Sequence, residues 1–173
     1  ICSCNIDETK EKLDLARLWF HEMTRVFGDR FINDEDRNWL KQLLDKGANE
    51  VYETEQDKLY EYGKAIIYCD FMSPDPFAKR NYNLITDVPK FIDRINKYLD
   101  EYNKEPKKKK LKLVMFLDAC GHINRICRIL KQPQGNALLL GVGGSGRQSL
   151  ARLATYINNY DCYQIDVVQG YDM

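Results

Sequence analysis

Apolar residues recur at intervals of three and four positions along several stretches of this chain, and such spacing predicts amphipathic helices. The first stretch predicts a helix over residues 9–28. A second helix is expected to start at Asn33 or Asp34, whose side chains are preferred at a helix N-terminus, and to end at Gly47. Helical character resumes over residues 48–62, where charges are denser. The first part of the chain is therefore expected to be helical.

Two further helices are expected in the middle of the chain. One starts at Thr86 or Asp87 and runs out before residues 104–110, a polar linker that holds five lysines. The other is predicted over residues 111–130, where the spacing of three and four continues without interruption. A short apolar run at 65–71 precedes both helices and predicts a strand or a buried extended segment.

Two apolar runs near the end of the chain, residues 136–142 and 161–168, predict β-strands on either side of a helix at 147–158. A strand, loop, helix and strand of this length usually form a right-handed parallel unit. The predicted fold class is therefore α/β. A mostly helical domain is expected over residues 1–106, and residues 107–173 are expected to begin a parallel-sheet domain.

The loop between the first of these strands and its helix carries the strongest chemical signal. Gly141 and Gly146 have the spacing of the two glycines in a phosphate-binding loop, and they lie between a strand and a helix as that motif requires. Glycines let the backbone turn its N–H groups inward, and the helix N-terminus adds a partial positive charge. The candidate nucleotide-binding residues are Gly141, Val142, Gly143, Gly144, Ser145, Gly146, Arg147, Gln148 and Ser149.

Two side chains depart from the full phosphate-binding pattern. Arg147 stands where lysine is expected; it keeps the positive charge, but its planar fork is bulkier than an ammonium group. Gln148 stands where a hydroxyl that ligates magnesium is expected, and Ser149 would point about 100° further round the helix. The alternative interpretation is a glycine-rich turn in a buried α/β unit that binds no ligand.

Composition narrows the possible partners. The 26 basic and 26 acidic residues cancel, so the chain lacks the basic excess expected of a nucleic-acid-binding domain, and the run Lys107–Lys110 is interpreted as a solvated connection. No apolar run reaches about 18 residues, so we expect no membrane partner. The chain begins at Ile1 rather than at Met, which favours a piece of a longer protein.

The six cysteines have irregular spacing and follow no secretory segment, which favours a reducing compartment over a disulfide framework. Cys2 and Cys4 are too close in sequence for the usual zinc-binding pair, and no second pair completes them, so no metal site is predicted. Cys120 and Cys127 fall on the apolar face of a predicted helix, where a thiol behaves as a small hydrophobe.

Other candidates carry less weight. His21 and Glu22 are neighbours in a helix and point in different directions, so a surface or edge histidine is expected rather than a catalytic pair. Ile129, Leu130 and Pro133 precede the glycine loop and are candidates to contact the adenine base of a nucleotide. Ordinary core packing explains these three residues equally well.

Three stretches together resemble the dynein heavy chain family, of the axonemal type. The segment GNALLLGVGGSGRQSLARLA at 135–154, with HINRICRIL at 122–130 before it, looks like the start of the fourth AAA+ module. The segment LWFHEMTRVFGDRF at 18–31 is similar to the helical lid of the third module. Gln148 fits the family, whose fourth modules resemble this loop in carrying glutamine at that position, with either lysine or arginine at the position of Arg147.

The resemblance implies part of a microtubule-based motor ATPase of the cilium or flagellum axoneme, within the cytoplasm and cytoskeleton. The implied ligand is ATP or ADP, with or without magnesium, at a regulatory site. Implied partners are the adjoining AAA+ modules and, through the parent protein, microtubules and dynein intermediate and light chains. The acidic residues of hydrolysis would lie beyond residue 173, so no ATP hydrolysis by this segment alone is expected. A kinase or GTPase fragment, or an AAA+ module with an empty site, remains an alternative.

Overall fold

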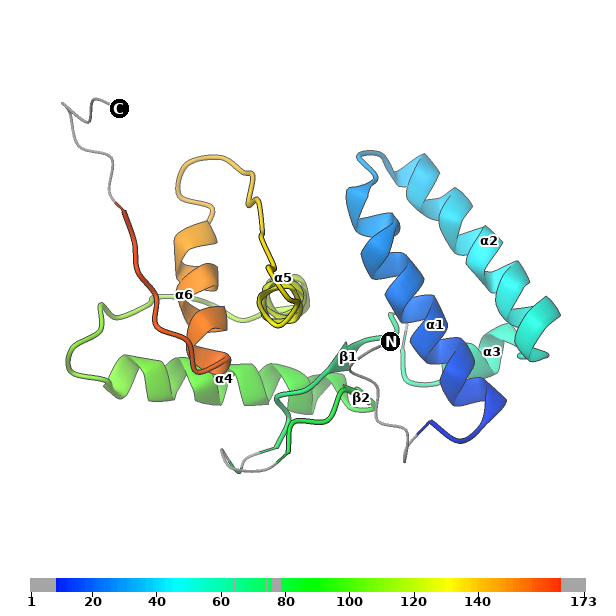
Figure 1. The fold of residues 1–173 in the computed structure, drawn as a ribbon, viewed down its shortest axis with the longest axis horizontal. Helices are drawn as coiled ribbons and strands as arrows, with labels where there is room; N and C mark the ends of the chain where they lie inside the picture. Colours follow the sequence, from blue (N-terminus) through cyan, green and yellow to red (C-terminus); the bar gives the residue numbers. More distant parts are fainter. Residues whose placement is uncertain (1–8, 64, 74, 76–78, 166–173) are drawn as a thin grey trace. The chain divides into compact units, whose positions relative to one another are not determined.

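The computed structural model describes residues 9–63, 65–73, 75 and 79–165, and the chain divides into two compact units, 1–91 and 92–173. Each unit is described by itself (Figure 1). The elements are α1 (Lys12–Val26), the 3₁₀ helix η1 (Gly28–Arg30), α2 (Asp34–Tyr52), α3 (Gln56–Leu59), β1 (Tyr68–Cys69), β2 (Asn83–Leu84), α4 (Val88–Lys104), α5 (Leu117–Leu130) and α6 (Arg147–Ile157).

The first unit is built on the hairpin of α1 and α2, which lie side by side in Figure 1. Asn33 caps α2 as predicted, since its side chain accepts a hydrogen bond of 2.7 Å from the amide of Asp36. The predicted end at Gly47 is wrong, because α2 continues to a left-handed residue at Glu53. Gly47 is instead a packing position: a Cβ there would lie 2.9 Å from the ring of Trp19.

The core of this hairpin contains six buried apolar residues, namely Ala16, Phe20, Leu40, Leu44, Ala48 and Leu59. Arg17 is buried beside them and donates to the carbonyls of Lys58 and Leu59, and it also forms a 2.8 Å ion pair with Glu61. Its guanidinium therefore fastens α3 and the following turn to α1. The role of Arg17 is therefore structural.

The interpretation of His21 as a surface or edge residue is wrong, because its side chain is buried. Its Nδ1 lies 2.8 Å from the carbonyl oxygen of Ile66, and its Nε2 lies 2.8 Å from the hydroxyl of Tyr82. A carbonyl only accepts, so Nδ1 carries a proton and donates to Ile66, while Nε2 shares a hydrogen bond with the hydroxyl of Tyr82, which also lies 3.4 Å from a carboxylate oxygen of Glu22. The strand expected at 65–71 is confirmed at β1, which pairs antiparallel with β2.

The second unit contains most of α4, α5 and α6. The predicted start of α4 is confirmed, since Asp87 accepts a 3.0 Å hydrogen bond from the amide of Lys90. The helix predicted over 111–130 begins only at Leu117. Residues 111–116 alternate between more and less exposed positions, the pattern of an extended segment rather than a helix. Leu111 is held there by two hydrogen bonds between its backbone and the side chain of Asn103.

Helices α5 and α6 pack against each other through fully buried residues, namely Cys120, Ile123, Cys127, Leu153, Ala154 and Ile157. The thiol of Cys127 donates to the carbonyl of Ala154 over 3.7 Å, and the side-chain amide of Asn158 donates to the carbonyl of Cys127 over 3.2 Å. This packing fixes α6 on α5 and so positions the glycine loop at the α6 N-terminus. The prediction that both α5 cysteines face the core is confirmed.

The strands expected at 136–142 and 161–168 are not formed in the described residues, and positions 166–168 lie outside them. Leu138, Leu140 and Val142 are 80–83% exposed. A strand needs a hydrogen-bonded neighbour, and the sheet in the described part of the chain is the antiparallel pair of β1 and β2. The apolar run at 136–142 therefore lies open to solvent.

Candidate functional site

The glycine loop joins residue 140 to α6, and its last residue opens the helix. Gly146 adopts the left-handed conformation, with φ of +78°, and no side chain caps the helix there. The first N–H groups of a helix have no partner within it, and they carry the positive end of the helix dipole. The start of α6 therefore presents uncapped amides, the feature that binds phosphate groups elsewhere.

The middle of the loop turns back on itself around Gly144. The amide of Ser145 donates to the carbonyl of Val142 over 3.2 Å, and Gly144 has a φ of +81°. A Cβ built on Gly143 or Gly144 would meet no other atom within 4 Å. Protein atoms thus leave space beside these two glycines, while the left-handed backbone at Gly144 favours glycine itself.

The first glycine of the motif is required for a different reason. A Cβ on Gly141 would lie 2.9 Å from the hydroxyl oxygen of Ser145 and 3.5 Å from Cδ of Arg147. The two ends of the loop therefore approach each other closely at Gly141. A larger residue there would have to displace the Ser145 hydroxyl.

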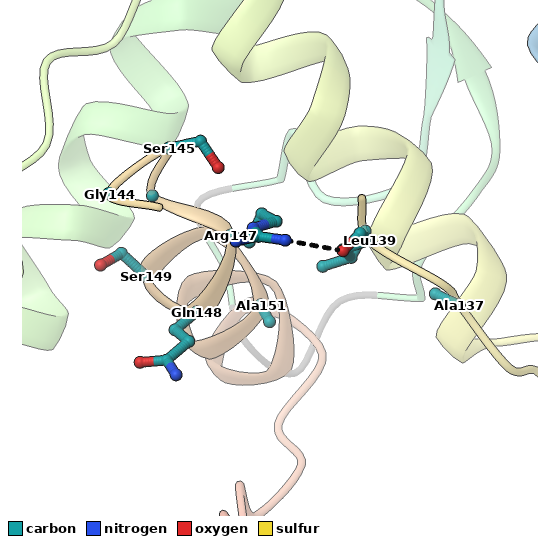
Figure 2. Close-up of a pocket in the computed structure, with 9 residues that line it drawn as sticks. Ala137, Leu139, Gly144, Ser145, Arg147, Gln148, Ser149 and Ala151 are labelled. Atoms are coloured by element: carbon teal, nitrogen blue, oxygen red, sulfur yellow. Dashed lines mark hydrogen bonds between the residues drawn. The ribbon is translucent and has the colours of Figure 1, made fainter. Parts of the chain in front are cut away.

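The side chain of Arg147 reaches from the start of α6 toward Leu139, as Figure 2 shows. One guanidinium nitrogen lies 3.4 Å from the carbonyl oxygen of Leu139, and the other lies 3.3 Å from that of Val142. Both distances are long for hydrogen bonds, so each contact is weak. Gln148 and Ser149 project from α6 away from this contact (Figure 2).

A cleft of about 760 Å³ opens beside the loop, and no carboxylate is among the described residues that line it: Ala137, Leu139, Gly144, Ser145, Gly146, Arg147, Gln148, Ser149 and Ala151. Six of the nine predicted site residues line the cleft, and Gly141, Val142 and Gly143 do not. Sequence reasoning missed Ala137 and Leu139, which alternate along the segment that enters the loop. That alternation is the sequence signal from which these two residues could have been predicted to lie on the same side of the segment.

Ile129, Leu130 and Pro133 are not among these lining residues, so their contact with a base stays a prediction. The carbonyl of Ile129 instead faces Gly135, where a Cβ would lie only 1.9 Å from its oxygen. Cys2 and Cys4 lie outside the described residues. Within those residues, no cluster of three or more potential metal ligands occurs, and no helix has the length and apolar character needed to cross a membrane.

Comparison with known proteins matches the two ends of the chain to protein families. Residues 111–173 match the family described as P-loop containing dynein motor region D4, and residues 1–62 match the AAA+ lid domain. Dynein axonemal heavy chain 1 of Homo sapiens is 48% identical over 166 residues, covering 96% of this chain. The chain belongs to the axonemal dynein heavy chain family. Human dynein axonemal heavy chains 6 and 17 are each 41% identical, over 99% and 94% of the chain.

This dynein segment spans 4% of the length of each of these three relatives. The predicted fold class is confirmed at the level of the family, as an AAA+ lid followed by a P-loop region. The family match removes the kinase and GTPase alternatives. The boundary at residue 106 stays a prediction; the two compact units meet inside α4, between Phe91 and Ile92.

Proposed function

We propose that residues 141–149 bind the phosphates of ATP or ADP at a regulatory site of an axonemal dynein motor. The main support is the combination of uncapped α6 amides, unfilled space beside Gly143 and Gly144, and a cleft whose lining, in the part of the chain that the structure describes, holds one cation and no carboxylate. Such a surface suits an anion, because the helix dipole and Arg147 both favour negative charge.

The described residues fit a nucleotide phosphate better than they fit a bare metal ion. Ser145, Gln148 and Ser149 bring neutral oxygens to the cleft, whereas a protein site for magnesium usually includes a carboxylate. Magnesium would therefore be held chiefly by phosphate oxygens, with Gln148 or Ser149 making a secondary contact. When bound, the nucleotide supplies the negative charge and the hydrogen-bond acceptors that the loop amides lack.

The segment is proposed to act within a longer motor. Its partners are the adjoining AAA+ modules of the heavy chain and, through the whole protein, microtubules and dynein intermediate and light chains. The place of action is the axoneme of a cilium or flagellum, as the names of the relatives suggest. We expect no hydrolysis by residues 1–173 alone, and nucleotide is proposed to act on the geometry of the ring.

Thermal denaturation with ADP tests the proposal on a longer heavy-chain segment that contains the complete module. A ligand at about 100 times its dissociation constant should stabilise the fold by roughly 2.7 kcal/mol. Gly146→Val is the control, since it places a branched side chain at a left-handed residue that opens α6. If the wild-type segment is folded and its melting temperature is the same with and without ADP, the result would support the empty-site alternative instead.

A further inference from the structure

The Arg147 side chain donates two hydrogen bonds to the main chain of its own loop region. Its guanidinium lies across the carbonyls of Leu139 and Val142, one before the loop and one inside it. Its aliphatic stem passes 3.5 Å from the position of a Cβ on Gly141. The side chain therefore spans from the first turn of α6 back to the segment that enters the loop.

We propose that Arg147 is a latch that holds the nucleotide-free loop closed and exchanges these two carbonyls for phosphate oxygens when nucleotide binds. This inference rests on the function proposed above and assigns to that site the residue that regulates it. The latch joins α6 to residues 139–142, so its release frees that segment from the helix.

The chemistry of the two partners makes the exchange favourable. A carbonyl oxygen is neutral, whereas a phosphate carries full negative charge, and charge-assisted hydrogen bonds between two ions are the stronger kind. The two carbonyl contacts are long, at 3.4 and 3.3 Å, and the lining residues within 9–165 that the structure describes include no carboxylate that would compete for the guanidinium. Arg147 can thus leave its present partners at small cost.

The second carbonyl links the latch to the turn of the loop. Val142 accepts from Arg147 and also from the amide of Ser145, over 3.2 Å. The guanidinium therefore holds in place the carbonyl on which the turn closes. Loss of the latch should loosen this turn, and the exchange of the Ser145 amide with solvent reports the loosening directly.

Lysine and arginine differ at this position in a measurable way. The planar guanidinium reaches two carbonyls at once, while an ammonium group is a point charge on a flexible stem. Arg147→Lys keeps the charge for phosphate but weakens the latch. Arg147→Gln removes the charge and weakens both interactions. Arg152→Lys makes the same chemical change further along α6, where the arginine contacts Gln164 and not the loop, and serves as the matched control.

The test is amide hydrogen exchange of the whole heavy chain, read in overlapping peptides that isolate residues 143–147, without nucleotide and across an ADP titration. Without nucleotide, the Ser145 amide should exchange about threefold to tenfold faster in both Arg147 variants than in wild type and Arg152→Lys, the effect of losing weak hydrogen bonds. Protection of the loop should reach half its maximum at a lower ADP concentration in Arg147→Lys than in wild type, and at a higher one in Arg147→Gln.

Equal Ser145 exchange in wild type and both Arg147 variants would overturn the latch, whatever ADP does. ADP-dependent protection that is the same in wild type and Arg147→Lys would also overturn it, while leaving the proposed nucleotide site intact. If no variant shows protection by ADP, the proposed function fails, and the nucleotide-free comparison still decides whether Arg147 closes the loop. Exchange of the buried α6 amides shows that each variant is folded.

Discussion

Alanine substitutions at the adjacent loop glycines Gly143 and Gly144 are expected to change the free energy of unfolding in opposite directions. A Cβ at Gly143 or Gly144 meets no atom within 4 Å, so neither substitution by alanine creates a clash. Gly144 has a φ of +81°, a region in which alanine costs about 1–2 kcal/mol. Gly143 lies outside that region, so alanine there should stabilise by about 0.4–1 kcal/mol, because it restricts the unfolded chain.

The two variants should therefore differ by about 2 kcal/mol in the free energy of unfolding, with Gly144→Ala the less stable. For a domain of about 150–250 residues, this corresponds to a difference of about 4–8 °C in melting temperature. The measurement is thermal denaturation of both variants, followed by circular dichroism, in a heavy-chain segment that contains the complete module. Equal melting temperatures, or a lower value for Gly143→Ala, would refute the loop conformation described above.

Three further predictions concern the unit that carries the loop. Gly135→Ala places a Cβ 1.9 Å from the oxygen of Ile129 and should lower the midpoint of urea denaturation. Gly121→Ala places a Cβ inside α5 that meets nothing within 4 Å. It should raise the midpoint by an amount equivalent to about 0.5–1 kcal/mol in the free energy of unfolding. Leu153→Ala should destabilise by about 2–5 kcal/mol in the same assay, since Leu153 is fully buried in α6. Burial raises the pKa of the Cys120 thiol from its ordinary value of 9.0 to about 11, so its contribution to stability is complete below pH 9 and is lost as the pH rises toward 11. Melting temperatures over that window should fall less steeply in Cys120→Ala; an unchanged slope would contradict the role of this thiol.

Local signals were enough to predict the elements whose cause is local. Asn33 caps α2 and Asp87 caps the start of α4, and both helices begin where these residues predict. The helix after the glycine loop follows the same rule, since Arg147 begins α6 as expected. A capping side chain acts on an amide three residues away, so the sequence alone contains both partners.

Elements that depend on distant partners could not be predicted in the same way. Gly47 indicates a helix end by itself, but the ring of Trp19 covers it and α2 continues. The buried state of His21 depends on Ile66 and Tyr82, which are 45 and 61 positions away. Periodicity does not identify such pairs, because they form only when the unit packs.

The candidate site shows the same division. The glycines at 144 and 146 were predictable, since a phosphate-binding pattern requires a turning backbone there, and both adopt positive φ. The contact of Arg147 with Leu139 and Val142 was not predictable, because it depends on how the loop folds over its own entry segment. Residues 136–142 have the composition of a strand but lack a neighbouring strand in the described part of the chain.

The most direct test of a phosphate-binding loop in this dynein segment is a cryo-EM map of the whole heavy chain with saturating ADP. We expect density for the diphosphate against the amides of residues 143–148, with the guanidinium of Arg147 turned from the carbonyl of Leu139 toward the diphosphate. A well-resolved loop without that density, with Arg147 still on its carbonyls, would contradict the account.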